Sequence, residues 1–193
     1  NSVSVSIEST PPVTTDDAPT DWVNDEYVTV NLFPTDDDSG MSGGSAGTFY
    51  CYNTALDCSP ATPGTSIALP QVLAGTSTVY YISYYSVDNA GNTEATVANV
   101  PVRIDRKPAT IGDDVPIGWT NNGSVTVTLS ASDSDSGVAG TAYCVETTPV
   151  ACDPNPDNGG IEGNIIDLAS MFGSVPTGSS ARYYISYGRR DND

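Results

Sequence analysis

The chain carries two copies of one sequence pattern, and this repeat limits what it can fold into. Trp22 and the turn Asp38-Ser39-Gly40 recur as Trp119 and Asp135-Ser136-Gly137, at a constant offset of 97 residues. Each copy then continues to a Tyr-Cys pair, a second Cys and the motif YYISY. A repeat of about this length has the size of one small β-sandwich, so we expect two domains in tandem.

Each copy has the alternation of a half-buried β-strand. Apolar and polar residues alternate in YVTVNLF (27–33) and in SVTVTLS (124–130), which places the apolar side chains on one face. Tyr, Val and Thr are frequent, and Gly or Pro clusters interrupt the chain at short intervals, as in all-β proteins. The sequence therefore predicts an all-β fold, with these inward-facing residues: Val28, Val30, Leu32, Val125, Val127 and Leu129.

A further strand follows the first copy, and its pattern recurs at the N-terminus instead of after the second copy. The strand alternates at Val100, Val102 and Ile104, and we interpret it as the closing strand of the first domain. At the same offset of 97, Val3, Val5 and Ile7 match those three residues. We therefore predict a donor strand at 1–9, a complete domain at 10–106, and an acceptor domain at 107–193 that lacks its closing strand.

The charge balance excludes several classes of function. Six basic residues stand against 24 acidic ones, and the net charge of -18 repels nucleic-acid phosphates and anionic membranes. No apolar run is long enough to cross a bilayer and no signal segment opens the chain, so we expect no membrane insertion. Histidine is absent, and no carboxylate pair or phosphate-binding loop is distinctive, so we expect no enzymatic activity.

The four cysteines fall in two pairs at matching places of the two copies, Cys51 with Cys58 and Cys144 with Cys152. Because there is no histidine, a zinc site would need all four thiolates from two domains. We therefore expect one disulfide in each domain, which implies an oxidising exterior and an extracellular location.

Acidic clusters precede the Ser-Gly pair of each copy. TDDDSG holds Asp36, Asp37 and Asp38, and SDSDSG holds Asp133 and Asp135. These clusters resemble fragments of calcium loops, because hard cations prefer several oxygen ligands, but they lack the spacing of an EF-hand. Asp and Ser before Gly also form ordinary turns. Calcium is therefore one candidate cofactor beside the turn interpretation, and a bend of the chain would add these residues: Asp88, Asn89, Asp191 and Asn192.

Three other features bear on ligands and modification. Trp22 and Trp119 are candidates for stacking on sugars, although equivalent Trp residues more often cover one end of a core. Asn122 opens the sequon Asn-Gly-Ser and is a candidate glycosylation site. IIDLASMF (165–172) lies in an insertion of the second copy, where we expect a short helical turn.

The pattern of TPPVTT, Trp, VTV, DSG, the two Cys and YYISYYSVDNAGN resembles the Ig-like repeats of secreted bacterial and archaeal surface proteins, such as adhesins and cell-wall arrays. The resemblance implies Ig-like β-sandwiches, a structural or adhesive role at the cell surface, and no catalysis. The second copy departs from the family pattern, since it reads GRRDND where the first reads SVDNAGN. The order of strands is also similar to that of donor-strand pilins, in which one subunit's N-terminal strand completes its neighbour's sandwich.

These observations favour a structural subunit of an extracellular filament, with identical subunits joined head to tail through Val3, Val5 and Ile7. Two other hypotheses stay open. In one, the chain is a two-repeat fragment of a longer Ig-like array in an adhesin or a cell-wall/S-layer protein. In the other, it is a carbohydrate-binding accessory module of a secreted enzyme, and Trp22 or Trp119 contacts a surface glycan.

Overall fold

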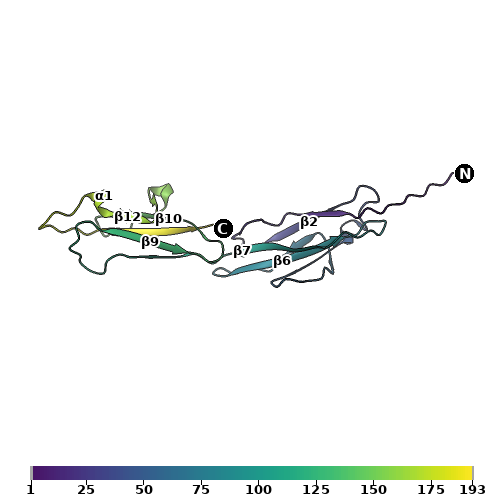
Figure 1. Ribbon diagram of the computed structural model, residues 1–193, viewed down its shortest axis with the longest axis horizontal. Helices are drawn as coiled ribbons and strands as arrows, with labels where there is room; N and C mark the ends of the chain where they lie inside the picture. The colour runs from purple at the N-terminus through teal and green to yellow at the C-terminus, as the bar shows by residue number, and fades with distance from the viewer. Residues whose placement is uncertain (1, 193) are drawn as a thin grey trace. The chain divides into compact units, whose positions relative to one another are not determined.

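The computed structural model describes residues 2–192, which form an all-β protein (Figure 1). Asn1, the first residue of the predicted donor strand, and Asp193, the last residue of the predicted second domain, lie outside the described residues. The chain divides into two compact units, which we call unit 1, up to Lys107, and unit 2, Pro108–Asn192. Antiparallel sheets build both units, so the prediction of an all-β, sandwich-like fold is confirmed.

Unit 1 has one sheet in the order β1-β2-β5 and a second in the order β4-β3-β6-β7. Val30 pairs with Ile67 between β2 and β5, and Tyr80 pairs with Val102 between β6 and β7; all four side chains are buried. The elements of unit 1 are β1 (Val13–Asp16), β2 (Thr29–Thr35), η1 (Gly44–Gly47), β3 (Thr48–Asn53), β4 (Thr62–Pro63), β5 (Ser66–Ala68), β6 (Ser77–Ser86) and β7 (Val97–Asp105). Its core consists of Val28, Val30, Leu32, Ile67, Leu69, Val72, Tyr80, Ile82, Tyr84, Val102 and Ile104.

Unit 2 has sheets in the orders β12-β9-β8 and β11-β10-β13. Val127 pairs with Ile166 as Val30 pairs with Ile67 in unit 1, so the repeat in sequence is a repeat in structure. The elements of unit 2 are β8 (Thr110–Asp113), β9 (Thr126–Ser132), β10 (Val138–Glu146), η2 (Pro156–Asn158), β11 (Ile161–Glu162), β12 (Ile165–Asp167), α1 (Leu168–Phe172) and β13 (Tyr184–Asp191). Its buried core is smaller and consists of Val127, Leu129, Tyr143, Ile166 and Leu168.

One tyrosine joins the two sheets of each unit. In unit 1 the Tyr84 hydroxyl on β6 donates to Asp16 Oδ2 on β1 (2.6 Å). In unit 2 the Tyr187 hydroxyl on β13 donates to Asp113 Oδ2 on β8 (2.5 Å). The same pair of residue types at matching positions shows that β13 occupies in unit 2 the place of β6 in unit 1.

Of the segment 165–172, where the sequence predicts a helical turn, Ile165–Asp167 form the strand β12, whereas Leu168–Phe172 form α1. Its N-cap, Asp167, accepts hydrogen bonds from the backbone N–H groups of Ala169 and Ser170, which satisfies two of the free donors at the helix start. Leu168 anchors the turn in the core. Nowhere in residues 2–192 is there a helix with the length and hydrophobicity of a membrane crossing.

Candidate functional site

β7 closes unit 1, and a neighbouring segment holds it on each side. On one side it pairs antiparallel with β6. On the other side Val23 N donates to Arg103 O (3.0 Å), and Asp105 N donates to Val23 O (2.9 Å). Between these neighbours the side chains of Val102 and Ile104 are fully buried in the core. β7 therefore both covers the edge of β6 and completes the core.

In unit 2, β13 lies at the edge of its sheet. It pairs with β10 on one side, and within residues 108–192 no strand pairs with its other side. Ile185 and Tyr187 on β13 match the fully covered Ile82 and Tyr84 on β6, yet both are only half-buried. The free edge of β13 is therefore next to incompletely covered apolar side chains.

A groove of about 870 Å³ opens beside β13 in unit 2. Residues 118–123 line it, and they match residues 21–26, the segment of Val23 in unit 1. Tyr183 and Ile185 also line it, and they match Tyr80 and Ile82 of β6. The groove is thus lined by the counterparts of the two segments that hold β7.

Val175 supports the same correspondence at one end of the groove. Val175 N donates to Gly123 O (3.2 Å), as Val72 N donates to Glu26 O (3.1 Å) in unit 1. Val72 is buried in the core that includes Ile104, whereas Val175 lines the groove and is half-buried. The groove therefore includes the region where unit 1 buries the end of β7.

The N-terminal segment contains the three residues predicted as the donor. Residues 2–9 form no helix or strand, and they run out from the sheets of unit 1 as an extended trace (Figure 1). Val3, Val5 and Ile7 are 93%, 82% and 91% exposed. Three aliphatic side chains at alternate positions of an unpaired segment form an apolar edge that is unusual on a soluble domain.

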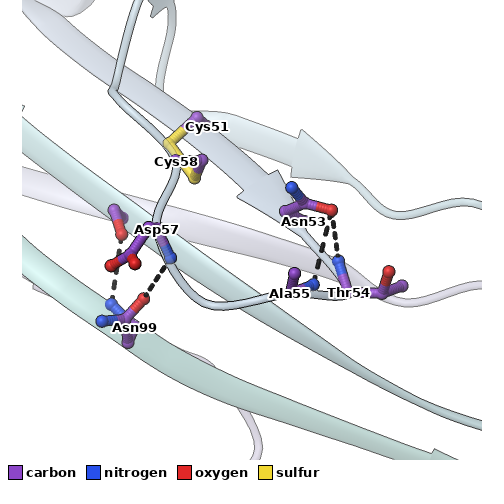
Figure 2. Close-up of a disulfide and its surroundings, with 8 residues drawn as sticks. Cys51, Asn53, Thr54, Ala55, Asp57, Cys58 and Asn99 are labelled. Carbon is purple, nitrogen blue, oxygen red and sulfur yellow. Dashed lines mark hydrogen bonds between the residues drawn. A yellow bond between two sulfur atoms is a disulfide. The ribbon is translucent and has the colours of Figure 1, made fainter.

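Both predicted disulfides are present, Cys51–Cys58 and Cys144–Cys152. Figure 2 shows that the loop closed by Cys51–Cys58 reaches β7, because Asp57 N donates to Asn99 Oδ1 (3.4 Å). The disulfides indicate an oxidising environment, as predicted.

Asp36, one of the predicted calcium ligands, belongs to a cluster of three carboxylates in unit 1. Oxygens of Glu8, Asp36 and Asp88 all lie within 4.8 Å of one another. Glu8 Oε2 accepts from Ser39 N (3.0 Å), and Asp36 Oδ1 accepts from Gly40 N (2.6 Å). Glu8 Oε1 is buried and has no hydrogen-bond partner among the described residues. We call these three residues the carboxylate cluster.

Asp88 is the most buried member of the carboxylate cluster, with 1% of its surface exposed. Burial raises the pKa of its carboxyl, but hydrogen bonds from Asn92 and from the amides of Gly91 and Ala90 outweigh this effect, so the pKa lies below its ordinary value. Asp88 is therefore ionised at neutral pH. Carboxylates this close repel one another, and their oxygens are the ligands that calcium prefers.

The other acidic residues predicted as calcium ligands lie outside this cluster, and carboxylate oxygens of Asp133 and Asp135 lie within 4.8 Å of each other in unit 2. Asp37 and Asp38 are exposed and are not members of the carboxylate cluster. Asp133 and Asp135 lie in the loop after β9, where Asp133 Oδ1 accepts from Asp135 N (2.7 Å) and Gly137 N (3.2 Å). These two bonds are those of an Asx-type turn.

The predicted approach of the Asp-Asn and Ser-Gly motifs occurs in both units. Asn89 donates from its backbone and side chain to the carbonyls of Ser39–Gly40 (2.8 and 2.9 Å). Asn192 does the same to Ser136–Gly137 (3.2 and 3.1 Å). Asp191, the counterpart of Asp88, instead accepts from the backbone N–H of Ala109 (3.2 Å).

The two tryptophans differ in exposure. Trp22 is half-buried, whereas Trp119 is 72% exposed on the groove, with the Arg182 guanidinium 5.2 Å from its ring centre. Asn122 of the sequon is exposed at the same groove, and its Oδ1 accepts from Ser124 N (3.0 Å).

Glu8 is the member of the carboxylate cluster that the sequence interpretation missed. It was assigned to the donor strand, and no acidic motif surrounds it. The repeat does carry a signal, because at the offset of 97 Glu8 matches Asp105, so each copy is preceded by a carboxylate at that position.

No known protein-family model matches this chain, and no curated protein matches it significantly. The inference of function therefore depends on the geometry of the two units and on their internal repeat.

Proposed function

We propose that this protein is the structural subunit of an extracellular surface filament, in which Val3, Val5 and Ile7 of one subunit complete unit 2 of the next. In this proposal both units are Ig-like β-sandwiches, and the role involves no catalysis. The observation that supports it most is that the groove in unit 2 is lined by counterparts of the segments that hold β7, while the residue pattern of β7 recurs on an exposed segment.

Two kinds of interaction favour the association. The three aliphatic side chains leave water and enter a groove whose counterpart in unit 1 is filled by Val102 and Ile104. The incoming backbone also forms a ladder with the free edge of β13, as a strand added to a sheet edge does. Both terms are needed, because ordering a segment that has no structure of its own costs conformational entropy.

The proposed contact can repeat from one subunit to the next. The donor segment belongs to unit 1 and the acceptor groove belongs to unit 2, so each subunit offers one of each. Such a heterologous contact extends from subunit to subunit into a fibre unless the rotation closes a ring. The partners are thus identical subunits, and the two disulfides suit a filament outside the cell.

Calcium is the ligand that we propose for the carboxylate cluster. Three carboxylates come together there, and a buried Glu8 oxygen has no partner among the described residues. A bound cation would neutralise the repulsion among them and would supply the missing partner. Because Glu8 follows the donor residues directly, calcium would also fix the direction in which the donor segment leaves unit 1.

Electron microscopy and size exclusion of the purified chain test the filament proposal. We expect fibres from the natural chain and from the control Ser4→Asp, whose charge lies on the outer face of the donor. Val5→Asp should give monomers, because it places a charge in the groove. Free peptide NSVSVSIEST should then bind unit 2 of the Val5→Asp chain and raise its unfolding temperature.

Two other outcomes would point to the other hypotheses. A monomeric natural chain whose unit 2 gains no stability from the peptide would favour a fragment of a longer Ig-like array. Glycan binding that is lost in Trp119→Ala, with assembly absent, would favour a carbohydrate-binding module, and the exposed Trp119 is the residue that such a module would use.

A further inference from the structure

In unit 1 a turn binds the end of the closing strand, in addition to the two segments beside it. Arg106 follows β7 directly; its carbonyl accepts from Gly75 N (2.7 Å), and its N–H donates to Thr76 O (3.0 Å). Thr76 also closes the turn 73–76, because its N–H and its hydroxyl both donate to Leu73 O (3.1 and 2.7 Å). Two backbone hydrogen bonds to this turn therefore fix the chain where it leaves β7.

Unit 2 contains the same turn, and two of its backbone groups have no partner among residues 2–192. The Ser179 N–H and hydroxyl both donate to Pro176 O (3.1 and 2.7 Å), which repeats the bonds that close the turn 73–76. Gly178 has a positive φ of 85°, close to the 83° of Gly75, so the two turns share their backbone shape. Gly178 and Ser179 both line the groove, and within residues 2–192 neither the Gly178 N–H nor the Ser179 carbonyl forms a hydrogen bond.

The side chains at this end differ between the two units, and they differ together. In unit 1 Arg106 Nη1 lies 3.6 Å from Glu26 Oε2 and donates to Val72 O (2.7 Å). At the offset of 97, Glu26 matches Gly123, which lines the groove, and Arg106 matches Ser9. Ser9 is exposed and forms no hydrogen bond among residues 2–192. The acid missing from unit 2 is therefore accompanied by a missing base in the N-terminal segment.

We infer that the turn 176–179 of one subunit binds Ser9 of its neighbour. This contact rests on the strand donation proposed above, and it adds a second place of binding beyond the three aliphatic side chains. Gly178 N–H donates to the Ser9 carbonyl, and the Ser9 N–H donates to the Ser179 carbonyl, which are the two bonds that hold Arg106 in unit 1. The turn has its shape before the strand arrives, so little besides Ser9 has to become ordered.

Two peptides with one added proline each test the backbone bonds. The full chain with Val5→Asp is the acceptor, and calorimetry measures its Kd for the reference peptide NSVSVSIEST. Ser9→Pro removes the N–H that donates to Ser179 O, so we expect binding about two- to tenfold weaker. Ser4→Pro is the matched control and should bind as the reference does, because β7 itself has Pro101 at the corresponding place.

A charge pair tests the placement of Ser9 beside residue 123. Gly123→Glu in the acceptor restores the acid of unit 1, and Ser9→Arg in the peptide restores the base. Together they should bind about two- to fivefold tighter than the two single changes predict, as expected for an exposed ion pair. Ser4→Arg places the same charge further along the donor, and it should show no such coupling with Gly123→Glu.

These measurements distinguish the contact at Ser9 from strand donation as such. A reference peptide that does not bind the acceptor would overturn strand donation, and the contact at Ser9 with it. If the reference binds but Ser9→Pro binds equally well, or Ser4→Pro is weakened as much, the turn 176–179 does not bind Ser9 and strand donation stands. Absence of coupling between Ser9→Arg and Gly123→Glu would likewise overturn the placement of Ser9.

Discussion

Ile82 and Ile185 occupy matching positions in the two units, but their surroundings differ. Ile82 has no exposed surface, because β7 covers the edge of β6 and places Val102 and Ile104 in the core. Ile185 lies on the edge strand β13 and is half-buried beside the groove. The side chain is the same in both units, so the difference comes from the neighbouring strand.

The tryptophans show the same difference at a second place. Trp22 is half-buried and next in sequence to Val23, which hydrogen-bonds to β7. Trp119 is mostly exposed, next to Thr120 on the groove. In unit 1 the segment before β2 is therefore hydrogen-bonded to the closing strand β7. Among the described residues, its counterpart in unit 2 makes no such hydrogen bond to a closing strand. The difference between the two units therefore shows how much side-chain burial one closing strand contributes to a sandwich.

The largest expected effect comes from removing the two isoleucine side chains in turn. Ile82→Ala should destabilise unit 1 by about 2 to 5 kcal/mol, because it leaves a cavity under β7. Ile185→Ala should cost less than half of this in the monomer, and should approach the cost of Ile82→Ala once the donor peptide is bound. Urea unfolding followed by the fluorescence of Trp22 or Trp119, one tryptophan in each unit, measures both.

Equal losses of unfolding free energy for Ile82→Ala and Ile185→Ala in the monomer would contradict this comparison, because the core of unit 2 would then be as well covered as that of unit 1. A loss at Ile185 that the peptide does not change would show that the strand enters elsewhere. The Val5→Asp chain is the background for these measurements, because it supplies monomers with the acceptor unaltered.

Supplying the closing strand within the chain should make the two units alike. The change extends unit 2 by a copy of residues 90–96, which lead into β7 in unit 1, followed by NSVSVSIEST. We expect the lower unfolding transition to rise by about 10 to 20 °C, the shift produced by about 2 to 3 kcal/mol in a domain of this size. Calorimetry checks the shift, and microscopy should show no fibres because the groove is occupied.

A matched control carries the same extension with aspartate in place of its central valine. It should leave the transition where it was and should leave fibre growth possible. If both extensions stabilise unit 2 equally, the gain comes from the longer chain and strand completion is excluded as its cause.

Much of the fold could be predicted from the sequence because the determining patterns are local. Alternation at Val28, Val30 and Leu32 identified β2 and its buried face, and the spacing of Cys51 and Cys58 identified a disulfide. A short helical turn was predicted within 165–172, and it forms at Leu168–Phe172. These properties depend on neighbours along the chain, so the residue order is enough to reveal them.

The carboxylate cluster could be predicted only in part, because it joins three distant segments. Asp36 was identified from its acidic loop, and Asp88 was expected only if a bend brought it near. Glu8 precedes them both in a segment without strand or helix, and its position depends on a hydrogen bond from Ser39 N. The groove was likewise hidden, since its lining comes from loops and strands that meet only in the folded unit.

Calcium should stabilise unit 1 and leave unit 2 less affected. At a free concentration about ten times its Kd, a ligand of the folded state adds about 1.4 kcal/mol, and a chelator reverses the gain. Glu8→Gln should abolish the response, whereas Asp37→Asn, an exposed neighbour outside the carboxylate cluster, should keep it. Thermal unfolding with calcium or chelator is the measurement, and an equal response of both variants would exclude this site.

The smallest expected effects separate the tyrosine bonds of the two units. Tyr84→Phe should cost unit 1 about 1 kcal/mol at neutral pH, because the half-buried Asp16 loses its hydrogen bond from the buried Tyr84. Tyr187→Phe should cost unit 2 less, since Tyr187 is half-buried. Urea midpoints of the two single variants, measured through the tryptophan of each unit, test this order, and the reverse order would contradict it.

The pH dependence of the stability of unit 2 gives a second test of the Tyr187–Asp113 hydrogen bond. The hydrogen bonds from Tyr187 and from the Val115 amide hold the pKa of Asp113 below its ordinary value, so the folded state binds this proton less readily than the unfolded chain. This contribution is complete at pH values above the ordinary pKa of about 4, and is lost as the pH falls through the lowered one. The pKa of Tyr187 is raised by the same bond, so its contribution is lost at alkaline pH. Tyr187→Phe should therefore flatten both limbs of a plot of the unit 2 urea midpoint against pH, and unchanged limbs would show that the bond does not form in solution.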